Sequence, residues 1–415
     1  MIKKAFIRNA MLLMTALVVV LSGCKKEDDD EDQQTEFKMN TIEAGSIDMN
    51  GATPPSDVPA DAVITATFST AIDASTATNT NIKLTRGYDD VEVAIDISVS
   101  GNTLTVTPTE NLGSGTLYTL LITSGLKSTD GQGLVQLTRS FTTAGAFVPS
   151  GQVAYFKFED NTDDETGNYN PIEEIDISFV DSKSESMGKA AAFNGNTSLI
   201  RIPNGDMIQN TNDFTLAFWM KANPVDHGLF VMGLSAWFGF QFEVGYNGDE
   251  NTFPSCKLAA QYEFADGSTG SEDLWFAGDG NLGWQGWTFS KDLTGQGGVN
   301  ALLRDKWAHI VCRYDSESKI GTMYINGEKM KEQDFNLWPE GDPKYTTVGL
   351  KWNGAAGNNT FVLGFIQDYE NPTVSDDWAD YTDPDNNHFD GILDDVAIYH
   401  RALTEQEISL MADAK

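Results

Sequence analysis

The segment DKWAHIVCRYDSESKIGTMYINGE, residues 305–328, shows how most of this chain folds. Its two apolar runs, WAHIVCRYD and GTMYING, have the length and the β-branched and aromatic content of strands. The second run ends at Asn326-Gly327, a dipeptide that strongly favours a two-residue hairpin turn. The segment therefore predicts neighbouring antiparallel strands.

Similar short runs, separated by Gly, Asn and Asp, recur along the chain, and helical periodicity is almost absent. This pattern predicts an all-β protein. A chain of 415 residues has room for two or more domains. The one convincing helix follows Thr404, because Thr404 and Glu407 match a capping box.

Residues 46–144 read as a small β-sandwich. In VEVAIDISVSGNTLTVTP, residues 91–108, apolar and polar residues alternate, so one face of the strand is apolar. The ordered motifs PPSDVPADAVITATFSTAID, NIKLT, GNTLTVTP, YTLLITSGLKSTDGQGL and SFTT resemble a bacterial Ig-like domain. That resemblance implies a spacer without an active site.

The N-terminus reads as a targeting segment. Lys3, Lys4 and Arg8 precede an apolar run that is too short to span a bilayer comfortably. Leu21-Ser22-Gly23-Cys24 resembles the lipobox of bacterial lipoproteins, which implies cleavage after residue 23 and lipid on the Cys24 sulfur. An ordinary secretory peptide with an incidental cysteine is the alternative. Residues 1–23 are thus interpreted as a signal peptide.

An acidic run, KKEDDDEDQQ, begins the segment 24–45, which we predict to be a disordered tether. The run also resembles the tracts that send some lipoproteins to the outer face of the outer membrane. We therefore expect a lipid-anchored protein of the outer membrane, exposed at the cell surface rather than retained in the periplasm.

Residues 150–415 are predicted to form one large sandwich after a small-residue linker. The ordered motifs YFKFEDNTDDETGN, GKAAAFNGNTSLIRIP, DFTLAFWMKA, DKWAHIVCRYDSESKIGTMYINGE and FDGILDDVAIYHRALTEQEI resemble the laminin-G-like, concanavalin A-like family. The resemblance implies a jelly roll that follows the Ig-like sandwich. Residues 238–302 depart from the family pattern, and we expect an insertion or a set of long loops there.

The formal net charge is −34, which would repel phosphate backbones and excludes nucleic acid as a partner. Acidic chains suit a cation or a neutral ligand. Apart from Cys24, the cysteines are Cys256 and Cys312. They either form one disulfide or remain buried thiols.

Three explanations compete for the aspartates of FDGILDDVAIY, residues 389–399: catalysis, surface charge and a bound cation. Surface charge suits Asp395. By strand alternation Asp394 shares an apolar face with Ile392 and Val396, where an unpaired carboxylate is costly. Oxygen ligands suit structural Ca²⁺, and the resemblance implies that Asp164 from the first loop is the partner of Asp394. Hydrogen bonds from backbone amides are the alternative.

Catalysis is best sought in EEIDISFV, residues 173–180. Glu174 and Asp176 lie two apart, as in retaining glycosidases of a related jelly roll, but the third acid is missing. Without a proton donor there is no general acid. We therefore expect no catalytic residue and no enzyme activity, and a glycan-cleaving enzyme is kept as the weaker alternative.

All nine tryptophans lie beyond residue 150. Trp284, Trp287, Trp352 and Trp378 lie in stretches rich in Gly, Asp and Asn, which we interpret as loops. Loop aromatics beside polar side chains suit a sugar platform, whereas a buried mini-core is the alternative. The sequence thus predicts a carbohydrate-binding surface lipoprotein. A protein-binding adhesin or assembly factor is the rival.

Overall fold

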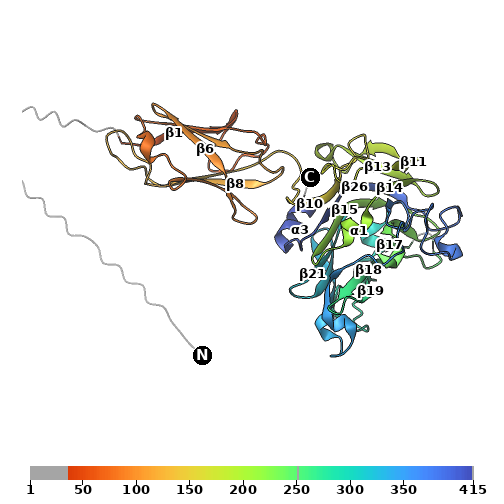
Figure 1. The fold of residues 1–415 in the computed structure, drawn as a ribbon. Helices are drawn as coiled ribbons and strands as arrows, with labels where there is room; N and C mark the ends of the chain where they lie inside the picture. The colour runs from red at the N-terminus through yellow and green to blue at the C-terminus, as the bar shows by residue number, and fades with distance from the viewer. Residues whose placement is uncertain (1–35, 250–251, 414–415) are drawn as a thin grey trace, which may run out of the picture. The chain divides into compact units, whose positions relative to one another are not determined.

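The computed structural model describes residues 36–249 and 252–413, and its architecture is nearly all β (Figure 1). The predicted all-β fold, an Ig-like sandwich followed by a concanavalin A-like jelly roll, is confirmed. No described helix is both long and apolar enough to cross a membrane. Cys24, the predicted signal peptide and the first part of the predicted tether lie outside the described residues.

The first domain consists of two sheets. Its elements are β1 (Met39–Ala44), β2 (Ile47–Asp48), β3 (Ile64–Phe68), η1 (Ala74–Thr76), β4 (Ile82–Arg86), β5 (Glu92–Val93), β6 (Ile95–Ser100), β7 (Thr103–Pro108), β8 (Leu117–Ile122) and β9 (Leu137–Thr142). One sheet has the order β2-β1-β3-β7-β6 and the other β5-β4-β8-β9. Alternating apolar residues such as Ile64, Phe68 and Leu120 fill the space between the sheets.

The predicted boundary between tether and first domain was wrong. Residues 39–44 were assigned to the tether, but they form β1, which pairs with β3. Phe37 and Ile42 are buried in the core of the domain. The acidic composition upstream masked this apolar alternation, which is what places the strand in the sheet.

The second domain consists of two larger sheets. The nine-stranded sheet has the order β12-β13-β26-β15-β21-β22-β23-β20, with β10 paired to β26. Its strands are β10 (Gln152–Phe156), β12 (Ser178–Asp181), β13 (Lys189–Asn194), β15 (Phe214–Ala222), β20 (Trp287–Ser290), β21 (Trp307–Asp315), β22 (Ile320–Ile325), β23 (Glu328–Asp334) and β26 (Asp390–Tyr399).

The eight-stranded sheet has the order β11-β14-β25-β16-β17-β18-β19, with β24 paired to β18. Its strands are β11 (Glu173–Ile175), β14 (Leu199–Ile202), β16 (Leu229–Leu234), β17 (Phe240–Val244), β18 (Cys256–Phe264), β19 (Thr269–Phe276), β24 (Thr347–Leu350) and β25 (Phe361–Leu363). The helices of the domain are α1 (Gly205–Gln209), α2 (Asn300–Leu303), α3 (Glu405–Ala412), η2 (Glu185–Met187), η3 (Ala236–Phe238), η4 (Thr294–Gln296), η5 (Phe335–Leu337), η6 (Pro343–Thr346) and η7 (Asp377–Ala379).

The main core of this domain draws on alternate residues of both sheets, for example Ile310 from β21 and Phe242 from β17. Removal of this apolar surface from water is the main force that holds the sheets together. Cys256 and Cys312 both lie in this core as free thiols, so they do not form the disulfide that was one of the two options.

The hairpin predicted at Asn326-Gly327 is confirmed. Both residues have positive φ, 53° and 77°, as a type I′ turn requires, and they join β22 to β23. The expectation for residues 238–302 was wrong, because that stretch forms the regular strands β17, β18, β19 and β20. Trp287, which the sequence analysis assigned to a loop, therefore lies on β20, and Trp275 lies on β19.

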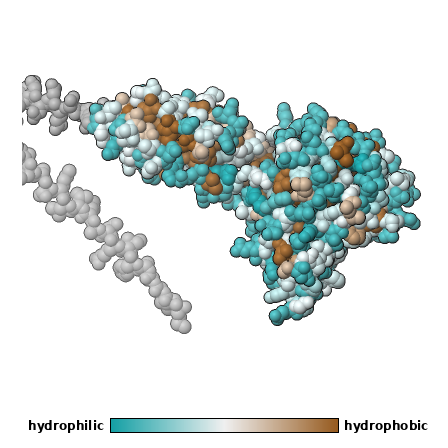
Figure 2. Space-filling model, viewed as in Figure 1, coloured by the Kyte–Doolittle hydropathy of each residue, from teal (hydrophilic) through white to brown (hydrophobic). Residues whose placement is uncertain are grey.

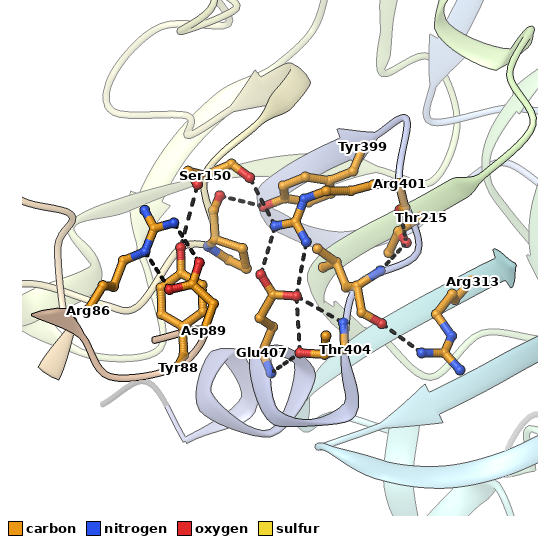
Figure 3. A network of polar contacts seen from close by, with 12 residues as sticks. Arg86, Tyr88, Asp89, Ser150, Thr215, Arg313, Tyr399, Arg401, Thr404 and Glu407 are labelled. Atoms are coloured by element: carbon orange, nitrogen blue, oxygen red, sulfur yellow. Dashed lines mark hydrogen bonds and ion pairs between the residues drawn. The ribbon is translucent and has the colours of Figure 1, made fainter. Parts of the chain in front are cut away.

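The predicted capping box at Thr404 is also confirmed, and it belongs to a wider polar network (Figure 3). Glu407 accepts two hydrogen bonds from Arg401, at 2.9 and 2.7 Å. Thr215 of β15 bridges the Arg401 carbonyl and the Leu403 amide. The network fixes α3 at the end of β26.

On the face shown in Figure 2, hydrophobic residues form small separate patches among hydrophilic ones.

Candidate functional site

A cavity of about 580 Å³ opens beside β17, β18 and β19, which lie side by side in Figure 1. Its volume is in the range of small-molecule sites. Tryptophans and paired charged side chains dominate its lining, which consists of Glu243, Gly245, Ser255, Cys256, Lys257, Ser271, Glu272, Asp273, Trp275, Trp284, Trp287 and Lys344.

The strands position the floor of the cavity through their alternation. Along β17, Phe242 and Val244 enter the main core, so Glu243 between them faces outward. The same alternation turns Lys257 of β18 and Asp273 of β19 to the outer face. Lys257 is directly opposite Glu243 in the ladder.

The floor is an ion-paired triad. The Lys257 ammonium lies 3.4 Å from a Glu243 oxygen and 3.1 Å from an Asp273 oxygen. Burial raises the pKa of Glu243, although the nearby Lys257 opposes that shift. Burial would lower the pKa of Lys257, but the two carboxylates outweigh it and the pKa is raised. Lys257 therefore stays charged and neutralises much of the acidity of the floor.

The wall is aromatic. Trp275 and Trp287 stack with ring centroids 5.9 Å apart at an interplanar angle of 21°. The Lys331 ammonium lies 3.4 Å from the centroid of the Trp287 ring, and burial lowers the pKa of Lys331 to about 8. Both contacts use up the faces that Trp287 could offer to a ligand, so Trp287 supports the wall rather than forming an open platform.

Trp284 is the open ring of the site. It is 57% exposed, and its indole N–H donates to Glu272 over 3.4 Å. Glu272 is buried, and it also accepts from Gln333 over 3.3 Å and pairs with Lys344. The buried carboxylate thus orients a tryptophan whose ring stays in contact with solvent.

The predicted ligand-binding tryptophans divide into separate places. Trp284 and Trp287 line the cavity, whereas Trp352 and Trp378 do not. Trp352 packs against the main core, which makes the mini-core reading the better one for this residue. Trp378 stacks on Trp237 with centroids 5.7 Å apart.

The sequence interpretation missed Trp275 as part of one cavity, and it missed the floor entirely. A usable signal was present in FQFEV, residues 240–244, and in SEDLWF, residues 271–276. Each places charged residues among apolar ones in a strand-like run. The floor of the cavity was missed because this stretch was assigned to loops.

Asp164 is a structural carboxylate. One oxygen accepts from the amides of Tyr155 and Thr166, at 2.8 and 3.1 Å. The other accepts from the Thr166 hydroxyl at 2.6 Å and from the amides of Asn168 and Tyr169, at 3.0 and 2.9 Å. Five donors thus use the carboxylate to tie the first loop to β10.

The predicted orientation of Asp394 was wrong. Between Ala217 and Trp219 of β15, the paired strand β26 carries one extra residue, and Asp395 has a φ of 48°. This β-bulge resets the alternation, so that Leu393 and Val396 both enter the main core. Asp394 lies opposite Trp219, away from that core, and does not share a face with Val396.

Asp394 and Asp395 form a buried acidic pair. Asp394 is fully buried and accepts from the Ser182 hydroxyl and, at 2.8 Å, from the Asp395 amide. Asp395 accepts from the Tyr155 hydroxyl. Burial, and then the charge of Asp395, raise the pKa of Asp394 to about 8, and burial raises the pKa of Asp395 as well. Asp395 is therefore more than the surface charge that the sequence suggested.

These contacts do not fit a calcium site made by Asp164 and Asp394. Both oxygens of Asp164 are occupied by donors, and Asp394 has donors of its own. Within residues 36–249 and 252–413, no group of three or more His, Cys, Asp or Glu side chains is arranged to hold a metal ion. The donor set is that of hydrogen-bonded carboxylates, the alternative that the sequence left open.

The acids of EEIDISFV are also separated. Glu174 lies on β11 and accepts from the Thr162 hydroxyl at 2.8 Å. Asp176 follows the strand, has a φ of 48° and accepts from the Thr197 hydroxyl at 2.6 Å. The two residues therefore do not project from one face of one strand, as the glycosidase pattern requires.

Comparison with protein families assigns both domains. Residues 46–143 match the bacterial Ig-like domain family, and residues 194–371 match the concanavalin A-like lectin/glucanase superfamily. The second match lies inside the jelly roll and includes β17, β18 and β19. The comparison with curated proteins found no similar sequence.

Solved structures with some similarity include domain 4 of AbnA, a GH43 extracellular arabinanase from Geobacillus stearothermophilus, in complex with arabinotriose (22% identity, TM-score 0.38, 63% of this chain and 98% of that chain). Others are the binding domain of Paraclostridial Mosquitocidal Protein 1 (16%, 0.41, 63% and 52%) and the botulinum neurotoxin serotype D ligand binding domain in complex with N-acetylneuraminic acid (12%, 0.39, 63% and 50%). This chain spans about half the length of the two toxin domains. Similarity at this level does not identify a ligand.

The first prediction concerns Asp164. We expect Asp164→Ala to lower the free energy of unfolding by about 2–4 kcal/mol, because several buried donors lose a charged acceptor. Urea melts of wild type and variant, with added calcium and with EDTA, measure this. The loss should be the same in both conditions. A loss that occurs only with calcium present would restore the metal interpretation.

The second prediction concerns the acidic pair. A raised folded-state pKa means that native Asp394 holds its proton longer than the unfolded chain does, so its contribution to stability falls as pH rises from about 4 to about 8. Asp394→Asn removes this titration and keeps an oxygen to accept from Asp395. Relative to wild type, the variant should gain stability between pH 5 and pH 8, by at most about 1.4 kcal/mol per pH unit.

Urea unfolding of both proteins at pH 5 and pH 8 gives this difference, because titrating groups far from the acidic pair contribute equally in both proteins and cancel. Asp181→Asn is the control, because Asp181 is an exposed carboxylate whose ion pair is with Lys189. A stability difference that does not change with pH would refute the role of the pair.

Proposed function

Because the chain carries a bacterial Ig-like domain followed by a concanavalin A-like domain, we propose that it is a surface lipoprotein that binds glycan without cleaving it. The binding site is the cavity walled by Trp275, Trp284 and Trp287. The observation that carries this proposal is the exposed ring of Trp284 beside the ion-paired floor of Glu243, Lys257 and Asp273.

The chemistry of this site suits a sugar. An aromatic face packs against the C–H groups of a pyranose ring, and fixed polar groups beside it give the ring hydroxyls directional hydrogen bonds. Carboxylates accept from hydroxyls, and the Lys257 ammonium donates to them. Because these groups hold one another in place before a ligand arrives, little side-chain entropy is lost on binding.

The same pairing argues against hydrolysis. A glycosidase needs one carboxyl group that delivers a proton and a second carboxylate that works beside it. In the floor, Glu243 and Asp273 both lie against the Lys257 ammonium. This cation opposes the rise in the pKa of Glu243 that burial causes, and so disfavours the protonated acid that a glycosidase needs there.

The third prediction tests the binding site. Trp284→Ala should weaken retention of the full chain, purified in detergent, on gels that contain arabinan, xylan, mannan or mixed-linkage glucan. The expected loss is about tenfold in affinity for each polysaccharide that binds wild type, because the open stacking face is removed. Ile172→Ala is the matched control, since Ile172 is 59% exposed, against 57% for Trp284, and lies outside the cavity.

If wild type binds and the two variants lose affinity to the same extent, the binding site lies elsewhere on the protein. Binding of none of these polysaccharides would remove the glycan proposal, and the protein-binding alternative would replace it. Release of reducing sugar that disappears in Glu243→Gln would show that the domain is an enzyme.

The anchor and the location are part of the same proposal. Lipid on Cys24 would hold the chain at the outer membrane, and the Ig-like domain would serve as the spacer between anchor and binding domain. The support is the lipobox sequence and the acidic run that follows it. A lipid anchor would keep the cavity at the cell surface while leaving both folded domains in water.

The fourth prediction tests the anchor. Cys24→Ala should move the protein from the membrane fraction to the soluble fraction, because the thiol that carries the lipid is gone. Immunoblots of fractionated cells, with Cys256→Ala as the control, measure this. If the Cys24→Ala protein still sediments with membranes after its signal peptide is removed, the anchor proposal fails.

A further inference from the structure

The cavity lies at one end of a row of side chains that crosses the eight-stranded sheet. In the ladders, Phe230 of β16 pairs with Glu243 of β17, Glu243 pairs with Lys257 of β18, and Lys257 pairs with Trp275 of β19. Residues paired across neighbouring strands project to the same face of a sheet. The four side chains therefore form one line at right angles to the strands.

The burial pattern places this line on the outer face. Leu229 and Val231, on either side of Phe230, enter the main core. Phe230 instead belongs to a separate apolar cluster that includes Phe365 and Ala379. The row thus begins at an aromatic residue, crosses a charged middle and ends at another aromatic residue.

A second aromatic surface stands at the Phe230 end. Trp378 of η7 lies edge-on to Phe230, with centroids 6.1 Å apart. Trp378 also stacks on Trp237 of η3 at 18°, and it remains 39% exposed. These contacts hold the Trp378 ring in a fixed place while leaving part of it open to solvent.

The spacing of strands sets the length between the two aromatic ends. Neighbouring strands lie about 4.8 Å apart, so three steps separate Phe230 from Trp275 by about 14 Å. One pyranose ring covers about one such step. A single sugar therefore cannot contact both Trp284, which lines the same cavity as Trp275, and Trp378, which contacts Phe230, whereas a chain of sugars can.

The charged groups along the row determine whether a neutral or an anionic oligosaccharide can bind. Lys257 pairs with Glu243 and Asp273, and Lys344 pairs with Glu272. Both lysines that line the cavity are thus neutralised by carboxylates. An anionic sugar would have to break one of these ion pairs and approach a chain of net charge −34.

We infer that the site is a trough whose occupant is an uncharged oligosaccharide of at least three sugar residues, stacked on Trp284 at one end and on Trp378 at the other. The inference rests on the proposed function and deepens it, because it adds the length and the charge of the ligand. A terminal monosaccharide is not the unit that the trough recognises.

The test is isothermal titration calorimetry, which measures the affinity of the full chain in detergent for neutral oligosaccharides of one to six residues. The neutral ligands are the arabino-, xylo-, manno- and cello-series. Oligogalacturonides of the same lengths are the anionic arm. Wild type, Trp378→Ala, Trp284→Ala and Ile172→Ala are compared. We expect affinity for at least one neutral series to rise about tenfold or more between two and four residues, as the second stacking contact forms.

Trp378→Ala should abolish that rise and lower the affinity for the tetrasaccharide more than the affinity for the disaccharide, whereas Trp284→Ala should weaken binding at all lengths. Affinity that is independent of length, or an equal loss at all lengths in Trp378→Ala, overturns the trough but leaves the proposed function standing. Tighter binding of oligogalacturonides overturns the inferred charge. Absence of binding in every series overturns the proposed function together with the trough.

Discussion

The alternation of side chains along β17, β18 and β19 is the constraint on which the rest of the second domain depends. One set of side chains, including Phe242, Leu258 and Leu274, joins the main core. The other set includes Glu243, Lys257 and Trp275 and faces the cavity. A slip of one residue would exchange the two sets and bury charged groups in the core, at a cost that a marginally stable domain cannot bear. The register that packs the core therefore also places the side chains of the candidate site.

The large elements were predictable because their cause is local. Alternation, the Asn326-Gly327 turn and the Thr404 capping box each act within a few residues, and each is found in the structure. The same reasoning failed where context decides. The Gly-rich, acidic stretch 238–302 resembles loops in composition, yet its apolar residues complete the core and force it into strands.

The site was predictable only in part. Trp284 could be selected from the sequence because an aromatic residue among Gly and Asn is unusual. Its neighbours could not, because Trp275, Lys257 and Glu243 come together only through the register of the β17–β18 and β18–β19 ladders.

The orientation of Asp394 was predicted wrongly from a local pattern. Perfect alternation placed it on the core face, and one extra residue at Asp395 turned it away, a bulge that no local pattern announces.

Fluorine NMR of the chain labelled with 5-fluorotryptophan tests the central claim most directly, because each of the nine tryptophans reports on its own surroundings. The probe is the hexasaccharide that binds best among the neutral arabino-, xylo-, manno- and cello-series. The trough predicts that the Trp284 and Trp378 resonances both move on addition of this hexasaccharide, while the core residue Trp338 and the strand residue Trp307 stay in place. Movement of Trp307 or Trp338 without that of Trp284 and Trp378 would contradict the account.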